Sequence, residues 1–374
     1  MFLTIIVFLF ILGFLILTHE FGHFIVAKKS GIRIEEFGIG FPPRIWGKKK
    51  GETVYSINLI PFGGFVKLYG EDEVDKKYLR DPQSFSAKPI WVKLLVIIAG
   101  VAMNFLLASL IFYFLLAVSG FVSQQFLVFD YQFPLGRQKN FPLVLAIEDG
   151  SPAVEIGIKP GNVIISGNGA RFRSIEEFIS FVDEKKGENI LLKVRDFKSQ
   201  EIREVSVVPR ISFPEGEGPL GVRLGEVAEL RYENFFEKTL AGFLHSLNFA
   251  HYSISAFGHL IKLSFQEETI KPLSSSVVGP VGILAITKIT LKEGIIALLN
   301  LMALISLALA VVNIFPFPAL DGGRLIFIGL EGLTGKKIPL EVEKNINLIG
   351  FVLLILLLIL ISYKDIVQFK DILF

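Results

Sequence analysis

The chain of 374 residues is 52% hydrophobic with a mean hydropathy of +0.57, which is more apolar than a soluble globular domain and predicts a multi-pass membrane protein with an attached soluble part. Its net charge of +2 includes no basic stripe apart from acidic neighbours, so nucleic acid is excluded as a partner and the lipid bilayer is expected. The chain has no cysteine, which excludes disulfides and thiolate metal ligands, so any zinc must be held by histidine and carboxylate side chains.

The first predicted element is a transmembrane helix over residues 1–27. Its apolar run, residues 2–17, lacks the basic region and the small-residue cleavage signature of a signal peptide. His19, Glu20 and His23 follow this run within the same helix. Ionisable groups at the end of so apolar a segment are costly in a bilayer unless they perform a task there.

His19 and His23 are spaced i and i+4, so they share one helix face and their imidazoles can bind one metal ion with Glu20 beside it. This spacing is the HExxH pattern of zinc hydrolases. The alternative is a helix end with a polar cap and two histidines that bond within the protein. The spacing of these residues is therefore compatible with two interpretations, a metal site or a purely structural helix end.

Residues 28–90 predict a loop whose first part is crowded with Lys and Arg, which places it on the cytoplasmic side. Residues 53–59 alternate like a strand, residues 61–64 predict a turn, and residues 65–68 continue as a second strand. We expect a short β-hairpin or meander with an exposed edge. An ordinary cytoplasmic loop is the alternative.

Residues 91–119 predict the second transmembrane helix, with Trp91 and Lys93 as interfacial anchors. Asn104 lies inside this helix. A buried Asn in a membrane span more often makes an inter-helix hydrogen bond than takes part in catalysis, and both roles stay open.

Residues 120–231 have a soluble character, with charges of both signs, short apolar strands and repeated turn glycines. Strands are predicted at 141–147, 190–194 and 204–208, and helices after Pro152 and over 175–185. This order resembles a PDZ domain of the bacterial, circularly permuted kind. The resemblance implies that Leu220, Gly221 and Val222 belong to a peptide-carboxylate loop and groove strand, where an extended peptide can add a strand. A spacer without a ligand is the alternative.

The remaining chain is divided between a surface segment and two further transmembrane helices. Residues 232–290 predict an amphipathic surface helix and a linker, with a true span as the alternative; its histidines at 245, 251 and 259 do not share a helix face. The third helix is predicted over 291–323, a cytoplasmic loop over 324–346, the fourth helix over 347–363 and a tail over 364–374. With the basic loop inside, four spans place the N-terminus, the PDZ domain and the C-terminus outside.

A catalytic zinc ion commonly has three protein ligands and one position left to water, so His19 and His23 need a third partner. Pro316 and Pro318 break the third helix at membrane depth, and Asp321 follows them with two glycines that can bend its carboxylate back into the bundle. Asp321 is therefore the best candidate for the third ligand.

These motifs together resemble the site-2 protease family of intramembrane zinc metalloproteases, more narrowly its bacterial RseP and RasP type with one PDZ domain. The similarity covers nearly the whole chain and includes HExxH, the Pro-Phe-Gly-Gly segment at 61–64, Ala99-Gly100 with Asn104, the PDZ insert and the Asn-x-x-Pro-x-Pro-x-Leu-Asp-Gly motif at 313–322. Val101 departs from the family pattern, which often has proline there, and weakens any role carried over to Asn104.

The resemblance implies a zinc-dependent endopeptidase in which Glu20 is the general base and Asn313 contacts the substrate backbone. It also implies a membrane-associated β-hairpin, with Gly63 and Gly64, that pairs with the substrate as an added strand. Expected substrates are transmembrane proteins or peptides, such as anti-sigma factors trimmed by an upstream site-1 protease and remnant signal peptides, in the bacterial cytoplasmic (inner) membrane. The PDZ domain is expected to act as a size filter or as a reader of a new C-terminus.

Two rivals from other classes remain. One is a non-catalytic membrane receptor or scaffold that reads peptides with its PDZ domain and carries a degenerate metal site. The complete set of Glu20 and Asp321 with two histidines argues against it. The other is a metal transporter, which needs ligands along several spans, whereas the sequence contains one cluster.

Overall fold

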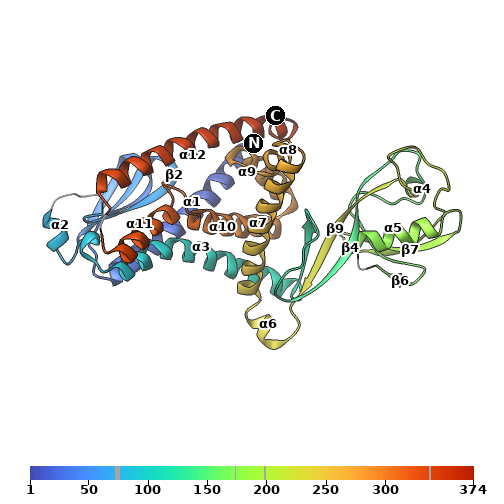
Figure 1. The fold of residues 1–374 in the computed structure, drawn as a ribbon, viewed down its shortest axis with the longest axis horizontal. Coiled ribbons are helices and arrows are strands. Elements are labelled where there is room, and N and C mark those ends of the chain that lie inside the picture. Colours follow the sequence, from blue (N-terminus) through green and yellow to red (C-terminus); the bar gives the residue numbers. More distant parts are fainter. Residues whose placement is uncertain (72–75, 173, 198, 337) are drawn as a thin grey trace. The chain divides into compact units, whose positions relative to one another are not determined.

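The computed structural model describes residues 1–71, 76–172, 174–197, 199–336 and 338–374 (Figure 1). The chain divides into two compact units. The membrane unit comprises residues 1–115, 245–253 and 260–374, and the PDZ-like unit comprises residues 116–244 and 254–259.

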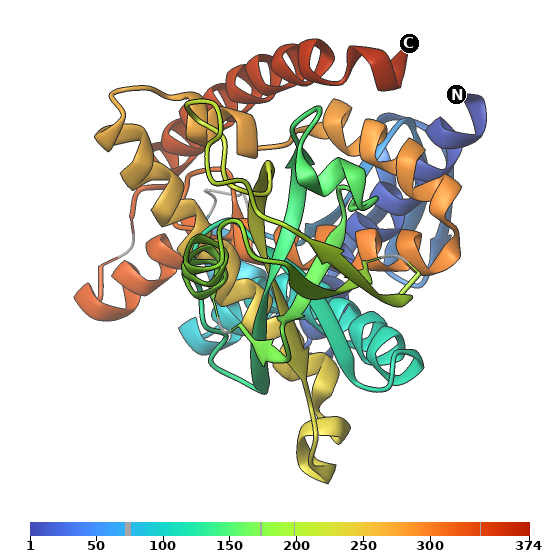
Figure 2. The same cartoon turned by 90° about the vertical axis from the view of Figure 1, so that its right-hand side faces the viewer.

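Four helices among the described residues are long and apolar enough to cross a membrane: α1 (Phe2–Lys29), α3 (Ile90–Val118), α10 (Ile295–Ile314) and α12 (Leu340–Gln368). They correspond to the four predicted spans, although α12 extends beyond the predicted range at both ends. The two chain termini lie at the same end of the membrane unit in both views (Figures 1 and 2), as an even number of spans requires.

Small residues and aliphatic side chains bring these helices together. Ile11 and Leu15 of α1 pack against Ile305 of α10, while Ala108 and Phe112 of α3 pack against Ala303 and Leu307 of α10. Close approach of helices at small residues is the usual way in which membrane helices pack, because lipid tails are as apolar as the side chains they would replace. The helix faces that meet are therefore determined by how closely their side chains fit together.

The loop predicted over 28–90 contains β1 (Ile34–Lys50) and β2 (Thr53–Leu68), which form an antiparallel hairpin. Residues 61–64, predicted as a turn, lie inside β2, so that prediction is wrong; the chain reverses at residues 51–52 instead. The positive φ of Gly63, 92°, and repeated register shifts bend the strand without ending it. The short helices α2 (Lys76–Arg80) and η1 (Phe85–Ala87) follow.

The hairpin folds back on itself, so that residues 36–39 have partners on two sides. They pair with residues 54–57 and with residues 64–67, while residues 54–57 pair in turn with 46–49. Residues 64–68 consequently form an edge, because the described residues provide a strand partner for them only at 34–39.

The PDZ-like unit contains a 7-stranded sheet in the order β3-β9-β4-β5-β7-β8, with β6 paired to β5. Its elements are β3 (Val122–Leu127), β4 (Arg137–Ile147), α4 (Pro152–Glu155), β5 (Asn162–Gly167), β6 (Ala170–Arg171), α5 (Ile175–Glu184), β7 (Ile190–Asp196), β8 (Ile202–Val207) and β9 (Val222–Arg231). The predicted strands and helices all occur. Strand β3 was not predicted, because its sequence, Val-Ser-Gln-Gln-Phe-Leu, lacks an alternation of apolar and polar residues.

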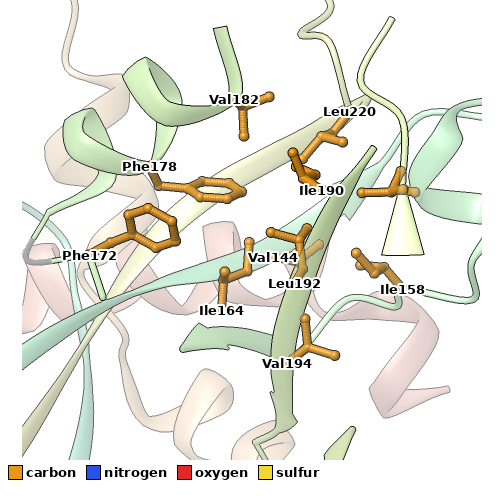
Figure 3. Close-up of a cluster of buried hydrophobic side chains, with 12 residues drawn as sticks. Val144, Ile158, Ile164, Phe172, Phe178, Val182, Ile190, Leu192, Val194 and Leu220 are labelled. Atoms are coloured by element: carbon orange, nitrogen blue, oxygen red, sulfur yellow. The ribbon is translucent and has the colours of Figure 1, made fainter. Parts of the chain in front are cut away.

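Alternating strand residues and one face of α5 form the core of this unit (Figure 3). Phe178 and Val182 of α5 point toward Ile190 and Leu192 of β7, and each of these side chains is buried. The Ser174 hydroxyl accepts a hydrogen bond from the Glu177 amide and begins the helix. Period-2 strands and an amphipathic helix thus build a core of the kind found in soluble domains.

The segment predicted as a surface helix and linker contains α6 (Phe235–Thr239), α7 (Ala241–Gln266), α8 (Lys271–Ser276) and the start of α9 (Pro280–Glu293). Helix α7 is not among the candidate spans. His245 is buried between Phe112 of α3 and Phe249, whereas His259 stacks on Phe129, so these histidines do not form a ligand pair. Helix α7 therefore buries a face around His245 against other helices, which a helix that only lies on a membrane surface does not need to do.

The C-terminal part differs from prediction in several respects: α10 ends at Ile314, before the predicted end at 323, and α12 continues into the predicted tail over 364–374. The predicted cytoplasmic loop over 324–346 lies largely in α11 (Asp321–Thr334) and in the start of α12, and α13 (Lys370–Leu373) ends the chain. Asp365 of α12 is fully buried and accepts hydrogen bonds from the amides of Gly279 (2.9 Å) and Gly282 (2.8 Å), which fixes the start of α9.

Candidate metal centre

Helix α1 carries the HExxH residues on a face that is turned toward α3. Gly22 makes this approach possible, because a Cβ atom there would lie 2.2 Å from the Ala99 carbonyl oxygen. Gly100 has the same effect on the opposite helix, where a Cβ atom would lie 2.4 Å from His23 Nε2 and 2.8 Å from His19 Cε1. The two imidazoles therefore occupy space that glycine leaves free.

Asp321 reaches the same place through a helix break. Helix α10 ends at Ile314, before Pro316 and Pro318, and α11 begins at Asp321. Gly322 belongs to the first turn of α11 instead of forming a flexible bend. A Cβ atom on it would lie 2.1 Å from the Phe315 carbonyl oxygen, so this glycine allows α11 to start directly against the break.

The structure brings His19, His23 and Asp321 together, with their ligand atoms all within 4.8 Å of one another. Asp321 Oδ2 lies 3.0 Å from His19 Nε2 and 3.4 Å from His23 Nε2, and the two Nε2 atoms are 3.2 Å apart. In a tetrahedral zinc site with bonds of about 2.0–2.1 Å, ligand atoms lie about 3.3–3.4 Å from one another. The three observed separations fit three corners of such a site.

The other atoms of His23 and Asp321 agree with a metal site, whereas His19 Nδ1 is buried and has no hydrogen-bond partner among the described residues. His23 Nδ1 bonds the Val96 carbonyl oxygen at 2.8 Å, which fixes the ring and leaves Nε2 for a metal ion. Asp321 Oδ2 is buried and makes no well-aligned hydrogen bond to any described residue. An acceptor buried in this way is costly unless another partner, such as a cation, binds it.

A cavity of about 400 Å³ lies beside these ligands. Glu20, His23 and Asp321 form its polar side. The edge of β2 at residues 65–68 forms another wall, and Val96 and Ile97 of α3 add apolar surface. The cavity thus joins the ligand set, a free carboxylate and a strand edge.

The other predicted substrate-binding residues are placed differently. Gly64 lies close to the base, because a Cβ atom there would be 3.5 Å from Glu20 Cγ, whereas one on Gly63 would meet the Phe41 ring at 2.6 Å. Neither glycine lines the cavity. Asn313 is half-buried in the last turn of α10 and is also absent from the cavity lining.

Lys93 departs from its predicted role, and Asn104 makes one of its two possible interactions only through its backbone. Asn104 is fully buried, and neither atom of its side-chain amide bonds a described residue; its backbone oxygen accepts the inter-helix hydrogen bond, from Ser306 Oγ at 2.8 Å. Lys93 is buried and lies 3.4 Å from Glu331 of α11, so it is no interfacial anchor, while Trp91 is exposed.

Sequence reasoning missed two charged residues at the cavity, Glu71 and Arg324, which form an ion pair. Arg324 follows Asp321 by three residues, and this spacing on a helix signals a shared face. Glu71 gives no such signal, because it lies in a loop, three positions after the last residue of β2.

The PDZ-like unit has its own groove, with a volume of about 350 Å³, between α5 and the start of β9. Val222 lines it, and Leu220 lies at its base as a core residue that is only 2% exposed. Gly221 has a φ of 68° and does not line the groove. Strand β3 covers β9 only at residues 226–231, so residues 222–225 pair with β4 alone among the described strands.

The fold and the site together define a class of protein: a multi-pass membrane protein whose helices bring together two histidines, an aspartate and a neighbouring glutamate, the residue types of a metallohydrolase site. The model of peptidase family M50 matches residues 7–357. The chain therefore belongs to peptidase family M50, the site-2 protease family that its motifs resemble.

Relatives in several bacteria match over nearly their whole length. A protein of Clostridium perfringens, named as a candidate zinc metalloprotease, is 34% identical over 94% of this chain and 95% of its own. The regulator of sigma-W protease RasP of Bacillus subtilis is 28% identical over 97% of this chain and 98% of its own. The zinc metalloprotease RasP of Geobacillus kaustophilus is 27% identical over 98% of both. This chain is accordingly a membrane metalloprotease.

Proposed function

We propose that this protein is a zinc-dependent endopeptidase that cleaves transmembrane segments, with His19, His23 and Asp321 as the metal ligands and Glu20 as the general base. The observation that carries the proposal is the convergence of three ligand atoms within 4.8 Å, beside a cavity that is lined by two of these ligands, by Glu20 and by a strand edge. Zinc is the metal favoured by this His/carboxylate set and by the names of the relatives.

Zinc bound by these three side chains would polarise the scissile carbonyl and lower the pKa of a water molecule. Glu20 then accepts the proton of the attacking water and returns it to the leaving amine nitrogen. Its carboxylate is suited to this task because it lies in the cavity beside His23 and Asp321 but is not one of the converging ligands. Val96 holds His23 in one ring orientation through the reaction.

The strand edge at residues 65–68 provides the means to present a substrate. A transmembrane helix satisfies all its backbone groups internally, so its peptide bonds are closed to attack until part of it unwinds. An extended peptide added to this edge recovers hydrogen bonds from β2 and is held next to Glu20. Gly63 and Gly64 belong to this substrate-binding strand, where Gly64 leaves room beside Glu20 Cγ.

Asn313 is proposed to contact the substrate backbone, as the family resemblance implies. It lies half-buried at the end of α10, and the loop that contains the helix break separates it from Asp321.

The PDZ-like groove is proposed to act before cleavage, as a size filter or as a reader of a new C-terminus. Leu220, Gly221 and Val222 form the loop and the start of the groove strand, and residues 222–225 of β9 leave an edge for an added peptide. Substrates would then be proteins already trimmed by a site-1 protease, such as anti-sigma factors, or remnant signal peptides in the inner membrane. Deletion of residues 140–224 should let intact full-length substrates be cut; if they stay uncut, the filter is wrong.

The decisive experiment uses purified wild-type and Glu20→Gln proteins, a model transmembrane peptide and a measurement of bound zinc. We expect one zinc per chain in both proteins and cleavage by the wild type alone. Equal cleavage by both proteins would refute the mechanism. Zinc binding without any cleavage would favour the receptor or scaffold, and zinc flux into vesicles would favour the transporter.

A further inference from the structure

The ion pair between Arg324 and Glu71 joins two walls of the metal-site cavity. Arg324 Nη1 bonds Glu71 Oε1, and both residues line the cavity. Arg324 stands one turn after Asp321 on α11, and Glu71 stands three residues after the edge strand ends at Leu68. The pair therefore connects the helix that supplies a metal ligand to the strand that is proposed to hold substrate.

The backbone around Glu71 is held firmly enough to transmit this connection. The Glu71 amide bonds the Leu68 carbonyl oxygen at 3.3 Å, and the Phe85 amide bonds that of Tyr69 at 2.9 Å. Gly70 has a φ of 72°, and a Cβ atom there would lie 2.0 Å from Ser84 Oγ. The end of β2 is thus tied to its neighbours, and the Glu71 side chain connects it to Arg324 of α11.

The charges of the cavity explain why a pair is needed here. Glu20, Asp321 and Glu71 are carboxylates, whereas Lys67 and Arg324 are cations; the Arg324 side chain is 36% exposed and that of Glu71 is 15% exposed. A half-buried pair is screened less than a surface pair, and a guanidinium binds a carboxylate in a fixed orientation. Glu71 engages Arg324 and thereby leaves Glu20 and Asp321 free for the metal site.

We infer that Glu71 and Arg324 form a positioning tether that sets the register of the substrate strand relative to the metal ligands. The inference rests on the proposed function, since it assumes that the edge at 65–68 binds substrate. One strand residue advances the chain by about 3.3 Å, so a shift of that size presents a different peptide bond. Misplacement of a substrate by about 1 Å can lower the rate about 100-fold.

The test compares Glu71→Gln, Arg324→Gln and the charge exchange E71R/R324E in full-length protein. The matched control is Glu331→Gln, which removes an ion pair with Lys93 on the same helix α11 but outside the cavity lining. The readouts are the bond cut in a model transmembrane peptide, found by mass spectrometry, together with kcat, KM, bound zinc and thermal stability.

We expect the two single variants to keep zinc and KM, to lose about 10- to 100-fold in kcat, and to cut at more than one bond. The charge exchange should recover the single cleavage position, and Glu331→Gln should change thermal stability alone. The tether is overturned if the single variants cut only the wild-type bond at the wild-type rate, if the exchange recovers nothing, or if Glu331→Gln spreads the cleavage positions equally. Wild-type cleavage that requires Glu20 tests the proposed function separately, so failure of the tether is distinct from failure of the protease.

Discussion

The metal centre of the membrane unit and the groove of the PDZ-like unit are built in opposite ways. The groove uses α5, one loop and the start of β9, which lie within residues 175–224, together with Glu148. The metal centre joins α1 at one end of the chain to α11 near the other. Strand alternation and an amphipathic helix mark the inner face of the PDZ-like unit, whereas the spans are apolar on all sides.

This difference shows which feature of the sequence marks the contact surface in each unit. In a soluble unit the position of an apolar residue tells which face is buried, because the other face meets water. In a membrane helix both faces are apolar, and the contact face is selected by small residues instead. Gly22 and Gly100 perform this selection at the metal centre. Changes in the two units should therefore have separate and distinguishable effects.

The largest expected effect follows from Asp321→Ala. This change removes one of three converging ligands, so zinc should be lost and cleavage should fall to the level of Glu20→Gln. Zinc content by elemental analysis and cleavage of a transmembrane peptide are the measurements. The PDZ-like unit should keep its hydrogen-exchange protection. Full zinc content in this variant would contradict the assignment of Asp321.

Gly100→Ala is expected to be nearly as damaging, although it adds only one methyl group. The new Cβ would lie 2.4 Å from His23 Nε2, so the imidazoles must move, at a cost of about 1–3 kcal/mol in the free energy of unfolding. Zinc affinity, measured by competition with a chelator, should fall. Gly13→Ala on α1 is the control, because no atom lies within 4 Å of its new Cβ. Equal zinc affinity in both variants would refute the packing argument.

Glu229→Gln tests the PDZ-like unit. Glu229 is buried between Arg195 (3.1 Å) and Arg231 (2.7 Å), so removal of its charge should lower the free energy of unfolding of this unit by about 3–5 kcal/mol. Hydrogen exchange of β9 in the full-length protein measures the loss. Glu233→Gln, in an exposed pair with Arg137, should cost about 0–1 kcal/mol. Cleavage of a short transmembrane peptide should not change in either variant.

A low pH should also lower the free energy of unfolding of the PDZ-like unit, by part of the amount that Glu229→Gln removes. Burial raises the pKa of the Glu229 carboxyl, but hydrogen bonds from Arg231 and Arg195 lower this pKa by more than burial raises it. The pKa of Glu229 therefore lies below the ordinary value. A depressed pKa contributes stability above the unfolded-state pKa of about 4.3, and this stability is lost as the pH falls through the folded-state pKa. Protection of β9 should therefore fall below about pH 4 in the wild type, and less steeply in Glu229→Gln.

The smallest expected effect belongs to Ile179→Arg, on the groove face of α5. A charge there should weaken binding of a peptide to the groove by about tenfold, or about 1.4 kcal/mol. Binding is measured by titration of a labelled peptide that ends in a free carboxylate. Ile202→Arg, on β8 and outside the groove lining, is the matched control. A similar loss in both variants would mean that the groove does not bind the peptide.

Most of the fold could be predicted from the sequence. The four spans were identified because about 20 consecutive apolar residues have few other uses, and the strands of the PDZ-like unit because their alternation is regular. The turn at residues 61–64 was predicted wrongly. Gly63 and its neighbours are turn residues by composition, but Ile60 pairs with Phe41 and Gly64 pairs with Ile39, so the segment between them stays in β2. Tertiary pairing here overrides the local preference.

The sequence by itself determined the chemistry of the candidate site, since His19, Glu20, His23 and Asp321 are the residue types that a zinc hydrolase needs. Only the tertiary structure decided that Asp321 meets the histidines, that residues 65–68 border the same cavity, and that Arg324 binds Glu71. The physical reason is that local spacing specifies which residues share one helix face. Contacts between α1, β2 and α11 depend instead on how closely separate elements can pack, and at this site glycine sets that distance.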